Sequence, residues 1–528
     1  MDYSKMTLRE KVLQTFIVTI REINRHGGPQ QFFSDYPVAG MYYAYLPGSE
    51  GTVETGTGTN PQRISECRSA SKLPLLICAD GCSLNGQTVL ASECAVGAIQ
   101  SEDAAYLYGK ILGMQMKGND VDWVLCPIVD LLYSREMPLF ALSDDPVLTA
   151  KLSRAIIRGI QDQGICATAK HFPGIGTCNL NMHFGPGQNL LSIEGWMTSY
   201  GHVYREAFQE QVCSVMTTHM TFPAYQIEGE NGFYPIATYS SKITTELLKK
   251  TLDFQGVVVT DALIMGGMAT GNLIEECAQA FRAGADLLLW PPVEAADRIV
   301  ELLESGDIPM SRLDDALNRI QRMRAFREYA IQTNQGCAPD VSFVDHASAE
   351  INQKGICLLR NHQNLLPINK HTSKKLLIVD VTDDGKSTSS ILLKNELAKA
   401  GFSVEVARNI YDVPSRVCWQ SDIDELQSRF DLLIFNVDME YATAWNVPFM
   451  LVWASHLFDK KKKVIVNYGS PFFADTYFPE DPTYIEVNAE PTAETVHSVV
   501  ERLLGLMPFT GMPVLRQKPQ VFPTASAK

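Results

Sequence analysis

The sequence ATAKHFPGIG, at residues 167–176, organises the chain, and Asn181-Met182-His183 follows it on the same segment. It begins as a run of small and apolar residues, which is typical of a buried strand, and the run ends in a Lys-His pair. Pro173-Gly174 then breaks the strand and predicts a loop. We therefore expect a polar site where this strand ends, with the loop that carries His183 reaching over it.

Five predicted strands end in a polar side chain at their carboxyl end. These strands and their end residues are Leu73–Ala79 with Asp80, Asp122–Val129 with Asp130, Ile165–Ala169 with Lys170 and His171, Ser214–Thr218 with His219, and Gln255–Thr260 with Asp261. A sixth strand, Asp286–Trp290, ends in Pro291-Pro292 instead. The five polar ends indicate a shared pocket rather than packing, because buried positions would be apolar.

Helical patterns separate these strands, and they lie at Ala104–Met116, Asp145–Gln163, Ile243–Leu252, Ile274–Ala283 and Arg312–Tyr329. Continuous apolar strands with helices between them predict a parallel sheet that is buried on both faces. Six or more such units in about 330 residues favour a (β/α)8-type TIM barrel over an open sheet. In such barrels the active site lies at the carboxyl ends of the strands, so the polar strand ends are candidate site residues.

A polar stretch from Gln332 to Ser342 predicts a linker, and a second α/β series follows it. Its predicted strands are Lys374–Val381, Phe402–Val406, Asp431–Val437, Lys463–Tyr468 and Thr483–Val487, and its predicted helices are Ser389–Lys399, Asp422–Arg429, Val447–Phe458 and Glu494–Leu504. This alternation predicts a smaller doubly wound αβα sandwich. We expect a TIM-barrel catalytic domain at residues 1–335, the sandwich domain at 345–516 and a disordered tail at 517–528.

The composition argues against several classes of partner. The 528 residues carry a net charge of −15, which disfavours nucleic acids and anionic membranes. The basic run Lys460–Lys463 precedes an apolar strand, and we interpret it as a solvated loop. We expect neither a leader peptide nor a membrane span, since no window approaches about 18 uninterrupted apolar residues.

The twelve cysteines are scattered along the chain, and several lie inside predicted strands, where a reduced thiol packs as a small apolar group. Cys78 and Cys82 are four residues apart, but no second pair completes a zinc site. We therefore expect neither metal nor cofactor. The cysteine usage predicts a reducing, cytoplasmic location.

The motifs resemble glycoside hydrolase family 3, and most closely its β-N-acetylhexosaminidase branch. The resemblance rests on Lys170-His171-Phe172-Pro173-Gly174, on Val258-Val259-Thr260-Asp261-Ala262-Leu263 with Met265 after it, and on three further segments, Met6–Val12, Gly355–Pro367 and Pro508–Val514. These motifs occur in the family's order and cover nearly the whole chain. The resemblance implies a TIM barrel and a second domain, as the strand pattern also predicts.

The resemblance implies a retaining mechanism on a small carbohydrate substrate. Asp261 would be the nucleophile that forms a covalent glycosyl-enzyme, and His183 on the loop would be the acid/base, with Asn181 as its partner. Histidine suits this role because it gains and loses a proton near neutral pH. The resemblance also implies that Asp80, Lys170, His171 and His219 line the sugar subsite.

The chain departs from the family's pattern at several positions. Asn181 stands where this branch usually has aspartate, and because asparagine brings no charge we expect His183 to be a weaker proton donor here. Ile175 stands where the family has histidine, and Phe140 lies where a sugar-contacting arginine is usual. Arg135 is the candidate to replace that arginine. After Asp80 the family's acidic, glycine-rich turn is replaced by Gly81-Cys82-Ser83.

Three functions stay open at the level of sequence. The first is a retaining β-glycosidase, with β-N-acetylglucosaminides as the first substrate guess. The second is a β-glycosidase or β-glycoside phosphorylase with another sugar preference, in which Glu440 is an alternative acid/base by placement; a neutral dyad repels phosphate less than a carboxylate would. The third is a sugar-binding protein whose catalysis has decayed. The aglycone and the oligomeric state are also open, as is whether the loop glycines act as hinges or only shape turns.

Overall fold

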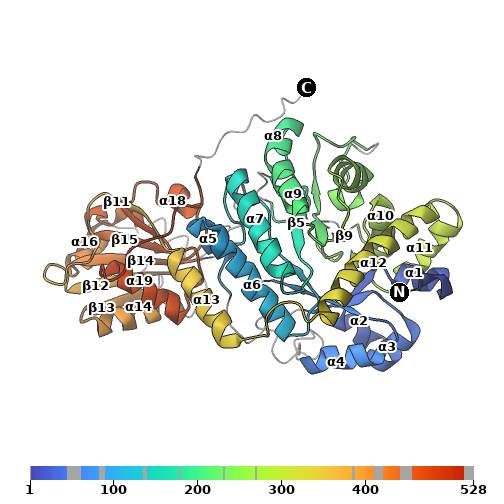
Figure 1. The fold of residues 1–528 in the computed structure, drawn as a ribbon. Helices are drawn as coiled ribbons and strands as arrows, with labels where there is room; N and C mark the ends of the chain where they lie inside the picture. Colours follow the sequence, from blue (N-terminus) through green and yellow to red (C-terminus); the bar gives the residue numbers. More distant parts are fainter. Residues whose placement is uncertain are drawn as a thin grey trace.

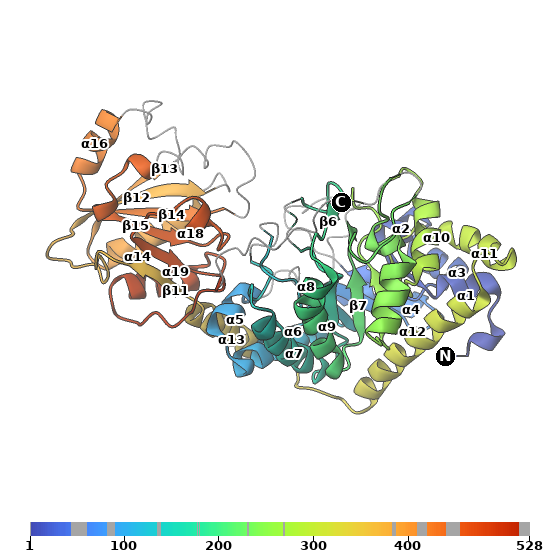
Figure 2. The ribbon, with the colours of Figure 1, turned by 90° about the horizontal axis from the view of Figure 1, so that it is seen from above.

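The computed structural model describes residues 2–43, 61–81, 90–134, 139–176, 178, 180–229, 232–267, 270–382, 387–408, 420–439 and 455–516. These residues form a larger lobe around strands β1 to β10 and a smaller lobe around strands β11 to β16 (Figures 1 and 2). Among the described helices, none is long and apolar enough to cross a membrane. Arg135, Glu440, most of the predicted helix Val447–Phe458 and the predicted tail at 517–528 lie outside the described residues.

The larger lobe is a closed parallel barrel. One sheet of five strands has the order β10-β1-β2-β3-β4, and a second sheet of three strands has the order β5-β7-β9. Single bridges join the two sheets at both seams, Trp123 to Cys166 and Ile128 to Lys170 at one, and Val259 to Leu287 at the other. The strands are β1 (Phe16–Thr19), β2 (Gly40–Tyr43), β3 (Leu76–Asp80), β4 (Trp123–Leu125), β5 (Thr168–Phe172), β7 (Ser214–Thr217), β9 (Val257–Thr260) and β10 (Leu288–Leu289). The predicted TIM barrel is confirmed.

Helices surround this ring of strands (Figure 1). They are α1 (Leu8–Leu13), α2 (Ile20–Arg25), α3 (Pro29–Asp35), α4 (Pro61–Ala70), α5 (Glu93–Ile99), α6 (Glu102–Gly118), α7 (Pro146–Gln161), α8 (Ile193–Thr198), α9 (Tyr200–Gln209), the π-helix η4 (Lys242–Thr251), α10 (Leu273–Ala283), α11 (Ala295–Glu304) and α12 (Met310–Gln332). Capping fixes where they begin, as at α7, where the Asp145 carboxylate accepts from two backbone N–H groups and Pro146 takes the first position.

The sequence analysis missed the first two strands of the barrel. β1 is only four residues long and directly follows the buried polar residues Gln14 and Thr15, which interrupt its apolar pattern. β2 begins with Gly40, and a glycine weakens any strand pattern. The glycine is required there because a Cβ atom would collide with the backbone of Leu76 on the neighbouring strand. Gly40 therefore weakens the strand pattern in the sequence for the same reason that the fold needs it: β2 and β3 pack too closely for a larger residue.

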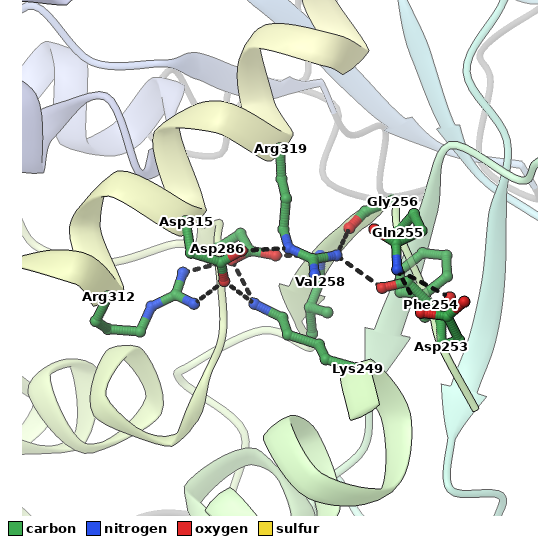
Figure 3. Close-up of polar contacts among 10 residues, drawn as sticks. All are labelled: Lys249, Asp253, Phe254, Gln255, Gly256, Val258, Asp286, Arg312, Asp315 and Arg319. Carbon is green, nitrogen blue, oxygen red and sulfur yellow. Dashed lines mark hydrogen bonds and ion pairs between the residues drawn. The ribbon is translucent and has the colours of Figure 1, made fainter. Parts of the chain in front are cut away.

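A buried ionic network ties α12 to the amino-terminal ends of β9 and β10 (Figure 3). The Asp286 carboxylate accepts from Lys249 Nζ at 2.7 Å, from the Arg312 guanidinium and from the Val258 backbone N–H at 2.8 Å. Asp315 on α12 accepts from Lys249 and Arg312 at 2.9 and 2.5 Å. The network lies at the end of the strands opposite to the polar strand ends, so it stabilises the barrel without entering the site.

The smaller lobe is one six-stranded sheet of order β11-β16-β15-β14-β12-β13. Its strands are β11 (Cys357–Asn361), β12 (Lys375–Thr382), β13 (Ser403–Arg408), β14 (Leu432–Asp438), β15 (Lys463–Asn467) and β16 (Thr483–Glu486), and its helices include α14 (Thr388–Lys399), α16 (Gln420–Ser428), α18 (Phe473–Thr476) and α19 (Ala493–Leu503). All pairs are parallel except β11 with β16. The sequence analysis missed β11, the antiparallel edge strand.

The basic run Lys460–Lys463 is not wholly a solvated loop, contrary to the prediction. Lys460–Lys462 form a short 3-10 helix, but Lys463 is the first residue of β15 and is fully buried. Its ammonium group forms an ion pair with buried Asp481 at 2.6 Å. A charge run at the start of a strand can therefore contribute a buried residue when a carboxylate on another segment neutralises it.

Helix α13 (Val341–Lys354) connects the two lobes and packs against α5 and α6 of the barrel (Figure 2). The Asn488 side chain, after β16, donates to the Gly355 carbonyl at 3.1 Å, and the Asn488 carbonyl accepts from the Ser92 hydroxyl at the start of α5. Ser143 also donates to the Val514 carbonyl at 2.9 Å. These contacts place the second lobe against α5, the helix whose first residue is Glu93.

Candidate active site

A cavity of about 510 Å³ opens at the carboxyl ends of the barrel strands. Six of its lining residues carry charged, imidazole or amide groups, and they come from β3, β5, the loop after β5 and the end of β9: Asp80, Lys170, His171, Asn181, His183 and Asp261. The rest of the described lining is mostly apolar or aromatic. The structure therefore brings together most of the site residues that the sequence predicts.

A bulge in β5 directs two consecutive side chains into the cavity. In a regular strand, successive side chains point to opposite faces. The register of β5 against β7 shifts between Lys170 and Phe172, so His171 has no partner in the ladder. Lys170 and His171 both line the cavity as a result. The peptide bond between them is cis.

Both residues of this pair are held by carboxylates. Lys170 Nζ donates to Asp80 Oδ1 at 2.8 Å, and the Lys170 side chain is 5% exposed. His171 Nδ1 lies 2.7 Å from Asp130 Oδ2, and the same oxygen accepts from the His171 backbone N–H at 3.0 Å. With Nδ1 facing a carboxylate, Nδ1 carries a hydrogen and Nε2 is left for the cavity.

Asp130 is one of the polar strand ends expected at the shared pocket, but the sequence analysis gave it no role, and the structure makes it a positioning residue. It is fully buried, and its second oxygen accepts from the Ile175 backbone N–H at 2.9 Å. One carboxylate thus fixes both the His171 ring and the start of the loop after β5. Its position at the end of a predicted strand was the available signal.

Asp261, at the end of β9, is partly exposed to the cavity. Burial favours the neutral acid, but the nearby His171 and Lys170 and the Ala262 backbone N–H outweigh it and lower the pKa of Asp261. The Ala262 N–H donates to Asp261 Oδ1 at 2.8 Å, which fixes the carboxylate on the turn. Asp261 is therefore an ionised carboxylate at neutral pH.

His219 lies behind Asp261, outside the cavity lining. Its Nε2 is 3.1 Å from the Ala262 carbonyl, which must accept, and its Nδ1 is 3.0 Å from the Thr238 hydroxyl. Burial lowers the pKa of His219, so the ring is neutral with its hydrogen on Nε2. The structure thus places this predicted sugar-binding residue where it holds the turn that follows Asp261.

The loop that carries His183 is docked on the segment that follows Asp261. The Gly266 N–H donates to the His183 carbonyl and the Gly267 N–H to the Met182 carbonyl, both at 3.0 Å. Glycine is needed at 267 because a Cβ atom there would lie 2.5 Å from the Met182 carbonyl oxygen. His183 Nδ1 is 2.7 Å from Asn181 Oδ1, so the amide oxygen takes the place of a carboxylate beside the ring.

Residues 7–323 match the model described as the N-terminal domain of glycosyl hydrolase family 3. The chain belongs to glycoside hydrolase family 3. Two solved structures cover 98% of the chain at 22% identity, a β-glucoside phosphorylase BglX with a TM-score of 0.81 and a family 3 β-N-acetylglucosaminidase from Paenibacillus sp. with a TM-score of 0.79. They confirm the two-domain fold.

The family 3 chain is also similar to curated relatives. It is 28% identical over 343 residues to a β-N-acetylglucosaminidase/β-glucosidase of Cellulomonas fimi, which covers 61% of each protein. It is 24% identical over 330 residues to β-hexosaminidase A of Pseudoalteromonas piscicida, which covers 56% of this chain and 54% of that relative. The chain therefore spans less than two thirds of the length of these relatives.

Three of the positions where this family 3 chain departs from the pattern, Phe140, Ile175 and Asn181, line the cavity. Ile175 and Phe140 both line the cavity with apolar groups. Arg135, the predicted replacement for the family's arginine, lies outside the described residues, as do Cys82 and Ser83. Among the described lining residues, Lys170 is the one cation with a fixed charge. Its charge is already matched by Asp80 at 2.8 Å.

The glycines at the start of the loop shape its turns. Gly174 and Gly176 have φ values of +103° and +67°, in the left-handed region that glycine tolerates. Gly174 also packs on the Tyr200 ring so closely that a Cβ atom would collide with it, and the Tyr200 hydroxyl accepts from the Gly176 N–H at 2.9 Å. The structure accounts for these two glycines by conformation and packing.

One group of described residues has the spacing of a metal site, Glu22, His26 and Glu294. It lies away from the cavity lining. The Arg25 guanidinium lies 3.5 Å from Glu22 and 3.2 Å from Glu294, so it forms an ion pair with each of them and offsets one of their two negative charges. An ion-pair network therefore accounts for this group.

Glu93 lies beneath the site as a neutral carboxyl. Its oxygens accept from the Ile128 backbone N–H at 3.2 and 3.3 Å and from the Cys126 thiol at 3.2 Å. Burial raises the pKa of Glu93 to about 8. Glu486 of the second lobe is also buried, and burial raises its pKa to about 8.

We predict that Glu93→Gln flattens the pH dependence of stability between about pH 4 and 8. The folded pKa lies above the unfolded value of about 4.3, so the fold holds a proton that the unfolded chain releases. The stabilisation that Glu93 contributes is complete below its unfolded pKa. It then falls by about 1.4 kcal/mol per pH unit until the pH reaches its folded pKa. Urea unfolding at several pH values measures this slope. Exposed Glu304→Gln is the control, and an unchanged slope in Glu93→Gln would contradict the prediction.

Proposed function

We propose that this family 3 chain is a retaining β-glycosidase with Asp261 as nucleophile and His183 as acid/base. The observation that carries the proposal is the ionised Asp261 carboxylate, which faces the same cavity as the Asn181–His183 pair. A carboxylate needs to be ionised to attack carbon, and an imidazole opposite it can serve the leaving group. Backbone hydrogen bonds join the loop of His183 to the segment that follows Asp261.

In the first step, an Asp261 oxygen forms a bond to the anomeric carbon as the bond to the glycosidic oxygen breaks. The electron pair of that bond goes to the leaving oxygen, which takes a proton from Nε2 of protonated His183. In the second step, His183 Nε2 takes a proton from water, the water oxygen bonds to the anomeric carbon, and Asp261 is released. The Asn181 oxygen accepts from His183 Nδ1–H throughout, and thus leaves Nε2 as the atom that exchanges the proton.

Lys170, Asp80 and His171 suit the sugar's hydroxyl groups. Lys170 donates to Asp80, and the pair offers both donors and acceptors to a hydroxyl. Asp130 directs His171 Nε2 to the cavity. As the first substrate class we propose β-N-acetylglucosaminides, since relatives of the chain carry the names β-N-acetylglucosaminidase and β-hexosaminidase.

A second candidate is phosphorolysis, in which phosphate replaces water as the acceptor. The neutral Asn181 beside His183 favours it, because an aspartate there would repel the phosphate dianion. The chemistry up to the covalent intermediate is the same. The acceptor oxygen is then supplied by phosphate, and the product is a sugar 1-phosphate.

A panel of chromogenic β-glycosides, with and without phosphate, tests these functions. We expect turnover of a terminal β-glycoside that disappears in Asp261→Ala. Turnover that requires phosphate and yields a sugar 1-phosphate would establish the second candidate. Absence of turnover on every glycoside, with sugar still bound by calorimetry, would contradict both and leave a sugar-binding protein.

We predict that Asn181→Asp moves the basic limb of the kcat/KM–pH profile to higher pH. The first step needs protonated His183, and a carboxylate 2.7 Å from Nδ1 would stabilise the imidazolium. The limb should move by about one pH unit or more, as is usual for an adjacent opposite charge. Initial rates from about pH 5 to 9 measure it. A profile with the wild-type basic limb would argue that His183 is not the proton donor.

A further inference from the structure

Large apolar side chains surround the mouth of the cavity on the side of the proposed proton donor. Leu180 and Phe184 bracket the Asn181–His183 pair and are 47% and 83% exposed. Ile264, three residues after Asp261, is 62% exposed. Leu180 and Ile264 also line the cavity, so the apolar surface continues from the cavity outward. We call Leu180, Phe184 and Ile264 the apolar rim.

The rim belongs to one connected surface. The loop of Leu180 and Phe184 is docked on the segment of Ile264 by the Gly266–His183 and Gly267–Met182 hydrogen bonds. Close packing of these two glycines against the opposite backbone allows the loops to approach. These bonds hold the loop that carries Leu180 and Phe184 against the segment that carries Ile264. Exposed apolar side chains that adjoin a cavity mark a binding surface.

The position of the rim identifies which part of a substrate it meets. An acid/base must lie within hydrogen-bond reach of the glycosidic oxygen, and the leaving group begins at that oxygen. Leu180 and Phe184 flank the residues that provide this proton, and Ile264 lies on the opposite segment. The residues proposed to bind the sugar, Asp80, Lys170 and His171, come from strand ends, and their side chains are only 30%, 5% and 12% exposed. The rim therefore faces the aglycone rather than the sugar.

We infer that the apolar rim is an aglycone subsite, and that the substrates are β-glycosides whose leaving group is an apolar alkyl or aryl alcohol. This inference rests on the proposed glycosidase function and adds the class of its leaving group. Burial of a methylene group stabilises a complex enough to raise kcat/KM up to about fourfold. The effect appears in kcat/KM because it is gained on going from free substrate to transition state.

The test compares methyl, butyl and hexyl N-acetyl-β-glucosaminides, whose alcohols differ in apolar length but little in acidity. Should the panel select another sugar, its alkyl β-glycosides replace them. We expect the hexyl-to-methyl ratio of kcat/KM to be at least about 10 in the wild-type chain. In Phe184→Ser and Ile264→Ser this ratio should fall at least threefold. Ile331→Ser, a 65% exposed residue near the end of α12, is the matched control and should retain it.

A wild-type ratio near one, or a ratio that both rim variants retain, would overturn the inference. Size-exclusion chromatography completes the test: if the chain forms dimers that Phe184→Ser dissociates while the ratio is near one, the rim is a contact between copies. If no glycoside is turned over, the proposed function fails by itself. The rim is then tested by calorimetric binding of hexyl and methyl glycosides to the wild-type chain, and equal affinities would overturn it.

Discussion

Replacement of Asp261 by alanine should reduce glycosidase turnover by about 10⁴-fold to 10⁶-fold, the scale of loss when a covalent nucleophile is removed. In the proposed mechanism this carboxylate forms the bond to the anomeric carbon, and the nearby His171 and Lys170 favour its ionised form. Without it, attack by water must proceed without a covalent intermediate. Initial rates on the best substrate of the panel measure the loss.

Two further measurements, one on Asp261→Ala and one on the wild-type chain, separate loss of the nucleophile from damage to the fold. Azide can enter the space that the carboxylate leaves, and it should restore turnover with an α-glycosyl azide as the product, because it attacks from the vacated face. In the wild-type chain, a fluorinated glycoside that slows the second step should label Asp261, which peptide mass spectrometry detects. Exposed Asp307→Ala should keep full activity. Labelling of another residue would show that Asp261 is not the nucleophile.

The second large effect is on stability, and we expect Asp286→Ala to lower the free energy of unfolding by about 3–5 kcal/mol. Asp286 is fully buried, and the side chains of Lys249 and Arg312 that it neutralises are 6% and 10% exposed (Figure 3). Removing one carboxylate leaves these two cations with Asp315 alone. It also leaves the Val258 N–H without its acceptor.

Chemical unfolding followed by circular dichroism measures this effect. Asp286→Asn keeps the volume and removes the charge, so a loss close to that of alanine would assign the cost to the uncompensated cations. The control is Asp297→Ala, which removes an exposed ion pair with Arg9 and should cost less than about 1 kcal/mol. A loss below about 1 kcal/mol in Asp286→Ala would contradict the prediction.

In the proposed acid/base pair, Asn181 stands beside His183 where the family's pattern has aspartate. Asn181 keeps the hydrogen bond to His183 that an aspartate would make, so the geometry of the pair persists without its charge. Hydrolysis depends on that charge through the proton donor, and phosphorolysis depends on it through repulsion of the acceptor. The same Asn181→Asp variant therefore informs on both candidate functions.

Much of the fold could be predicted from the sequence because runs of apolar residues mark the segments that become buried. Continuously apolar strands such as β3, β9 and β12 were recognised, since each needs apolar residues on both faces. β1 and β2 were not, because buried polar residues directly precede β1 and a glycine begins β2, and both features weaken a strand pattern. Asp80 and Asp261 were found as candidate site residues because each ends a buried strand.

The sequence by itself determined the barrel, the family and the polar residues at the strand ends, because these follow from neighbours along the chain. Only the tertiary structure decided how those residues are used. The bulge in β5 directs both Lys170 and His171 into the cavity, and burial behind Asp261 gives His219 the carbonyl of Ala262 as its partner. Such roles depend on contacts between segments that are distant in sequence, and no pattern within one segment contains them.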